Sequence, residues 1–233
     1  ALARDGRDAV LRAALPALLP GVAAAAFHGA IRTAHAVDAG HEGELAAALA
    51  YWAWRWQPLA PAVRGAALPV DEWCVRLVAA GETCAFDGSL ISLRMARAAQ
   101  SAPYRELAGR LAPTADLPER MLAFAVQRYA DTRNFTVLHM VTGLRALRVL
   151  LPWMRDSDAA LREVVTAFTA AYLSAAIRPA ALSPIPVMTW PTIVQRAIAS
   201  DDDHVIKLVH ACHGAAKRNL PGAFLAAASR AVA

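Results

Sequence analysis

The spacing of apolar and polar residues is that of amphipathic helices along almost the whole chain. Apolar positions recur every three to four residues, and no stretch keeps the alternation of a half-buried strand. Prolines 58, 61, 69, 113 and 118 interrupt the pattern, as does the segment Ser183-Pro184-Ile185-Pro186. The pattern predicts an all-α protein with helices over residues 5–19, 22–39, 43–56, 70–80, 88–100, 117–130, 135–151, 157–177, 190–199, 203–217 and 220–231.

The stretches between the predicted helices are too short and too apolar to divide the chain. We therefore expect residues 1–233 to form a single multi-helix domain with a buried site between helices. Hydrophobic residues make up 57% of the sequence, much of it alanine, which favours helices. No uninterrupted apolar run approaches the roughly 20 residues of a membrane span, so we expect no membrane partner.

The net charge of +5 is spread over scattered arginines. They form no continuous basic run and no recognised nucleic-acid motif, so a mildly basic surface without a nucleic-acid partner is the favoured interpretation. The three cysteines, Cys74, Cys84 and Cys212, have no Cys-x-x-Cys spacing. They indicate buried thiols in a reducing, cytoplasmic setting rather than disulfides or a zinc ribbon.

Three histidines, His28, His139 and His204, lie in apolar segments predicted to be helical. A buried imidazole needs a partner at both ring nitrogens, and a metal ion can be one of them. A single such histidine is more often a hydrogen-bonded core residue. Three in one small domain favour a shared metal site, although spacing alone does not show that they converge.

Lys207 is one of only two lysines beside 22 arginines, and it follows His204 by three residues on the same helical face. A neutral buried amine can act as a base or form a Schiff base, or it can take up carbon dioxide and become an anionic metal ligand. The alternative is a lysine whose stem is buried and whose amine pairs with Asp203. His35 and His210 fall on the faces of His28 and Lys207 and could line the same cavity.

The aromatic segment Tyr51–Trp56 has two interpretations. It could form an aromatic wall for a planar substrate, or it could end an amphipathic helix with Trp52 and Trp56 packed on the core. The second is favoured.

Three segments together resemble the questin oxidase-like family. They are Phe27-His28-Gly29-Ala30-Ile31-Arg32-Thr33-Ala34, Asn134-Phe135-Thr136-Val137-Leu138-His139-Met140-Val141-Thr142-Gly143 and Asp202-Asp203-His204-Val205-Ile206-Lys207. The resemblance implies a helical oxygenase that binds non-heme iron through four histidines and a carboxylated lysine. By motif, His28, His139 and His204 correspond to three of these histidines and Lys207 to the lysine.

Family members are longer and carry an upstream histidine segment, typically with an Asn-His pair, that this sequence lacks. We therefore expect the fourth histidine to lie in a missing N-terminal segment, or the site to be incomplete. Fungal relatives oxidise anthraquinones and open a quinone ring in Baeyer–Villiger fashion. The resemblance thus implies an O2-dependent oxidoreductase that oxygenates or cleaves an aromatic, quinone-like small molecule at mononuclear iron(II).

Further roles follow as hypotheses from this assignment. Asp203 is expected to support a metal ligand, and Arg32 to hold an anionic substrate oxygen. No Gly-x-Gly-x-x-Gly motif follows a strand, so a nicotinamide reductant such as NADPH would be external, bound elsewhere or acting through a partner. Two alternatives stay open: a zinc-dependent hydrolase, and a non-catalytic helical domain whose histidines only fill the core.

Overall fold

The computed structural model describes residues 2–178, 182–216 and 221–233, and it confirms the all-helical prediction. Within these residues it has 13 α-helices and no strand, in one domain. The helices are α1 (Leu2–Asp5), α2 (Arg7–Leu18), α3 (His28–Ala39), α4 (Glu42–Arg55), α5 (Val70–Thr83), α6 (Ile91–Ala98), α7 (Ala102–Leu107), α8 (Leu117–Thr132), α9 (Phe135–Leu150), α10 (Ser157–Ser174), α11 (Trp190–Ala199), α12 (Asp203–Ala216) and α13 (Pro221–Ala231).

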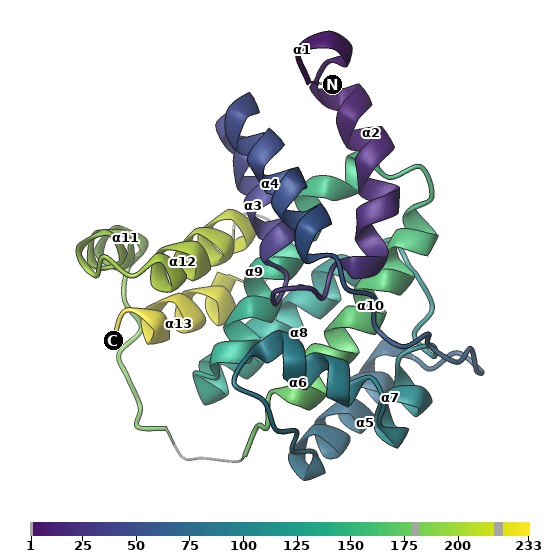
Figure 1. Ribbon diagram of the computed structural model, residues 1–233. Coiled ribbons are helices and arrows are strands. Elements are labelled where there is room, and N and C mark those ends of the chain that lie inside the picture. Colours follow the sequence, from purple (N-terminus) through teal and green to yellow (C-terminus); the bar gives the residue numbers. More distant parts are fainter. Residues whose placement is uncertain (1, 179–181, 217–220) are drawn as a thin grey trace.

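Helix α9 is the centre of the fold. It is buried on almost every face and packs against α3, α8, α10 and α12 (Figure 1). The segment Phe135–Trp153 is long and apolar enough to cross a membrane by length and composition alone. However, 67% of its apolar window is buried inside the protein, as expected of a core helix. Side chains on α9 that point toward α3 and α12 are therefore buried between helices.

Two of the predicted helices differ from the structure near the N-terminus. The helix predicted over residues 22–39 begins only at His28, because Ala25, Ala26 and Phe27 take left-handed backbone conformations with φ of 48°, 53° and 67°. The helix predicted over 5–19 is divided at Gly6, where φ is 79°. The apolar run Val22–Ala26 indicated burial correctly, but a buried turn satisfies the same pattern as a buried helix.

Most other helix boundaries agree with the predictions within a few residues. The short helix α7 was not predicted, and the helix predicted over 157–177 ends at Ser174. The predicted end at 217 and start at 220 lie outside the described residues. Trp52 is buried as expected, whereas Trp56 is 43% exposed and donates its indole N–H to the carbonyl of Ala17.

Candidate metal centre

His28 is the first residue of α3, directly after the left-handed turn. Its Nδ1 lies 2.5 Å from the carbonyl oxygen of Ala25. Because a carbonyl oxygen can only accept, Nδ1 carries the proton and Nε2 keeps its lone pair. The turn therefore fixes both the position and the tautomer of this imidazole.

His139 lies one turn into α9 and is almost fully buried. Its Nδ1 lies 2.9 Å from the carbonyl oxygen of Phe135, so its Nε2 also keeps the lone pair. The start of α9 is held by Asn134, whose Oδ1 accepts from the backbone N–H groups of Thr136 and Val137 at 2.9 and 3.2 Å. Its amide nitrogen donates to the carbonyl of Ala175 at 2.9 Å. The cap thus ties the helix bearing His139 to the end of α10.

His204 lies in the first turn of α12. Its backbone N–H donates to Oδ1 of Asp202 at 2.8 Å, and its Nδ1 lies 2.9 Å from Oδ1 of Asp203. Each of the three histidines therefore has an oxygen partner at Nδ1, either a carbonyl or a carboxylate. Such outer partners orient histidine ligands in metal sites and raise their basicity.

The fold brings the three histidines together, although they are far apart in sequence. One nitrogen from each ring lies within 4.8 Å of the corresponding nitrogens of the other two. The ring centroid of His139 lies 5.1 Å from that of His28 and 5.3 Å from that of His204. In a tetrahedral site with metal–nitrogen distances of about 2.1 Å, ligating nitrogens lie about 3.4 Å apart, so nitrogens separated by up to 4.8 Å would approach one another to hold one ion.

Burial keeps two of these imidazoles neutral. It lowers the pKa of His139 to about 4, partly offset by the hydrogen bond to Phe135, and the neighbouring His28, His204 and Lys207 lower it further. The pKa of His28 is also lowered, mainly by burial and then by the charges of Lys207 and His204. A neutral imidazole offers a lone pair to a metal without first losing a proton. The chemistry of this donor set fits a divalent transition metal.

The carboxylate of Asp203 connects His204 with Lys207. Oδ1 accepts from His204, and Oδ2 forms an ion pair with Nζ of Lys207. The hydrogen bond from Lys207 lowers the pKa of Asp203 below its ordinary value. The pairing of Lys207 with Asp203 is the alternative that the sequence left open, and it holds the amine beside the histidine cluster.

The remaining predicted site residues lie along the same helices. The rings of His35 and His210 face each other across α3 and α12 with centroids 5.4 Å apart. Burial lowers the pKa of His35 to about 4, helped by the charge of Arg145. The guanidinium of Arg32 lies over the Tyr51 ring, 5.0 Å from its centroid. These residues form no shared ligand set with the three histidines among the described contacts.

Comparison with known proteins bears directly on this site. Over residues 109–212 the chain matches the Questin oxidase-like family. This questin oxidase-like segment contains His139, His204 and Lys207, whereas His28 lies upstream of it and is brought to the cluster by the packing of α3 on α9. The resemblance found in the sequence is confirmed for this part of the chain. No curated protein matches the chain.

Two features of the site were missed by sequence reasoning. The ring of Phe135 lies 4.7 Å from the His139 ring and 4.9 Å from the His204 ring, so it borders the cluster. The left-handed turn at Ala25–Phe27 lies within the stretch predicted as helix. Phe135 precedes His139 by four residues, so in a helix the two side chains are neighbours, and this spacing could have identified it. The alanines of the turn carry no preference for left-handed backbone.

Proposed function

We propose that this protein is a metal-dependent oxidoreductase that uses O2 to oxygenate or cleave an aromatic, quinone-like small molecule. The convergence of three imidazole nitrogens within 4.8 Å carries the proposal, and the match of residues 109–212 supports the reaction class. Iron(II) is the proposed metal, because imidazole ligands suit it and it supplies the redox chemistry that activates dioxygen.

In this proposal His28, His139 and His204 hold the metal through Nε2. The carbonyls of Ala25 and Phe135 and the carboxylate of Asp203 keep the Nδ1 protons and the ring orientations in place. His139 is the most deeply buried of the three, so its side of the site excludes water. Phe135 offers an aromatic face beside two of the rings, which suits a planar substrate.

Lys207 is the proposed additional ligand. Carboxylation would join its Nζ to the carbon of carbon dioxide with loss of two protons from the ammonium group, which replaces a cation with an anionic oxygen donor. The support for this assignment is that Lys207 lies in the matched segment, three residues after His204, and corresponds by motif to the lysine of the family. Arg32 is proposed to contact an anionic substrate oxygen, and NADPH to act as an external reductant; the proposed location is cytoplasmic.

Three histidines are also the ligand set of catalytic zinc, so a zinc-dependent hydrolase is the second candidate. The two candidates differ in their dependence on oxygen. We expect the iron-loaded chain, supplied with NADPH, to consume O2 when an electron-rich anthraquinone is added, and His139→Ala to abolish this consumption. Turnover that is unchanged under strict anaerobiosis, or equal in His139→Ala, would contradict the oxygenase proposal.

A further inference from the structure

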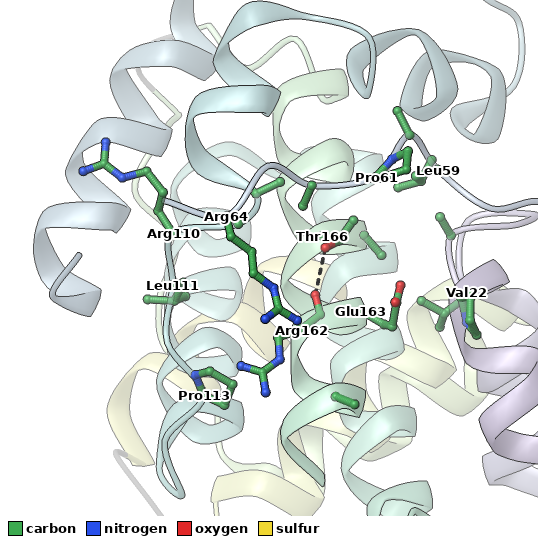
Figure 2. Close-up of a pocket in the computed structure, with 18 of the residues that line it drawn as sticks. Val22, Leu59, Pro61, Arg64, Arg110, Leu111, Pro113, Arg162, Glu163 and Thr166 are labelled. Carbon is green, nitrogen blue, oxygen red and sulfur yellow. Dashed lines mark hydrogen bonds between the residues drawn. The ribbon is translucent and has the colours of Figure 1, made fainter. Parts of the chain in front are cut away.

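A second candidate site lies apart from the histidine cluster. A cavity of about 600 Å³, open to solvent, is lined by the loop of residues 58–67, the segment 108–113, residues 20–23 and the α10 residues from Ala159 to Ala167 (Figure 2). Its volume is in the range that encloses a small organic ligand. None of its lining residues belongs to the three-histidine set.

The wall of this cavity is held by specific contacts. The backbone N–H of Leu68 donates to the carbonyl of Arg110 at 2.8 Å, and Nε of Arg110 donates to the carbonyl of Ala66 at 3.0 Å. The hydroxyl of Tyr104 donates to the carbonyl of Ala60 at 2.7 Å. A Cβ at Gly109 would lie 2.1 Å from the carbonyl oxygen of Val63, so glycine is needed for this close approach. The loop is therefore fixed against its neighbours and the cavity is a defined feature of the fold.

Two arginines supply the charge of the cavity. Figure 2 shows the side chains of Arg64 and Arg162 pointing into the same part of it, while Arg110 points away. Both side chains are exposed, and within the described part of the chain neither Arg64 nor Arg162 has a carboxylate within ion-pair distance. Two guanidinium groups that point into one open cavity create a local positive potential that attracts an anion.

The other walls are mostly apolar. Val22, Leu59, Pro61, Leu111 and Pro113 line the cavity, and Glu163 is its one acidic residue. The hydroxyl of Thr166 is committed to the carbonyl of Arg162 at 2.8 Å, within α10 (Figure 2). The lining therefore combines two unpaired guanidinium groups with a wall that favours an apolar body.

We propose that this cavity binds a small organic anion, whose carboxylate or phosphate group is held by Arg64 and Arg162 and whose apolar body packs against the proline- and leucine-lined wall. Guanidinium groups bind both kinds of anion through paired, charge-assisted hydrogen bonds. The cavity shares no residue with the metal centre, so a negative result in its binding test leaves the oxygenase proposal unaffected.

The test is isothermal titration of the full chain with three probes of one shape: 2-naphthoate, 2-naphthyl phosphate and the neutral 2-naphthamide. We expect at least one anion to bind one per chain and about tenfold or more tightly than the amide, as charge-assisted hydrogen bonds require. The tighter of the two anions assigns the site to a carboxylate or a phosphate ester. Binding of the amide as tightly as both anions would overturn the proposal.

Variants locate the binding site. Arg64→Gln and Arg162→Gln are each expected to weaken binding of the anionic probe by about tenfold or more. Arg196→Gln, at an exposed arginine of α11 outside the cavity, is the matched control and should leave the affinity for the probe unchanged. Equal binding in the original chain and both cavity variants would contradict the proposal. If either variant fails to fold, the affinities of the original chain for the anionic probes and the neutral amide still test the proposal.

Discussion

The ring of Phe27 lies directly against Gly143 of α9. A Cβ at position 143 would come within 2.7 Å of Cγ of Phe27. Phe27 immediately precedes His28, and Gly143 follows His139 by four residues, or about one helical turn. This contact therefore sets the separation of the backbones that carry two of the three histidines.

Replacing Gly143 with alanine should move α3 away from α9. Overpacking of a core contact costs about 1–3 kcal/mol, so we expect Gly143→Ala to lower the free energy of unfolding in urea by that amount. Gly214→Ala is the control, because a Cβ at this helical position meets nothing within 4 Å. It should be neutral or stabilise the protein by up to about 1 kcal/mol. Equal losses in both variants would contradict the role of the Phe27 contact.

The cap of α9 makes a second prediction. Asn134→Ala removes the acceptor of two backbone N–H groups and leaves the carbonyl of Ala175 without its donor. We expect a loss of about 1–2 kcal/mol in the free energy of unfolding. Asn134→Asp keeps the acceptor and should recover part of this loss. No difference between the alanine and aspartate variants would show that the cap contributes little.

The sequence predicted the helices well because their amphipathic pattern is continuous and their caps are local. Asp202 before α12 and Asn134 before α9 are examples of signals that act within three residues. The turn at Ala25–Phe27 was predicted wrongly because its cause is tertiary. Its left-handed backbone lets Phe27 reach Gly143, more than a hundred residues away, and alanine itself carries no signal for that conformation.

The site was predictable in its residue types but not in its assembly. Apolar surroundings singled out His28, His139 and His204, and the structure brings these three together. The roles of Lys207, Arg32, His35 and His210 stay predictions, because they depend on bound groups or on the protonation of Lys207. The cavity at Arg64 and Arg162 could not be foreseen, since it depends on how an irregular, proline-containing loop folds over α10.

Asp203 is predicted to support metal binding through both of its partners. Asp203→Ala frees Nδ1 of His204 and the amine of Lys207, so we expect metal affinity to fall by about 10–100-fold in a chelator competition assay. Asp158→Ala removes an exposed first-turn acid of α10 and is the matched control. An affinity change of the same size in the two variants would count against a specific role of Asp203.

His35 is predicted to make stability depend on pH. Its pKa is lowered from 6.5 to about 4 in the folded protein, so the unfolded chain binds more protons between these values. The free energy of unfolding should therefore fall as the pH is lowered from about 6.5 to 4, with His35 contributing on the order of 1 kcal/mol after solvent screening. Urea unfolding of His35→Gln at several pH values should show a smaller loss. Parallel curves for the two proteins would contradict this assignment.

Metal content tests the central claim most directly. The chain is purified anaerobically without a histidine tag, loaded with iron(II), desalted and analysed by mass spectrometry. The account predicts close to one iron per chain, near-complete loss of iron in His139→Ala, and full retention in His41→Asn, which removes an exposed histidine but keeps an acceptor for the N-cap of α4. Full iron occupancy in His139→Ala, or no metal in the original chain, would contradict a metal centre at His28, His139 and His204.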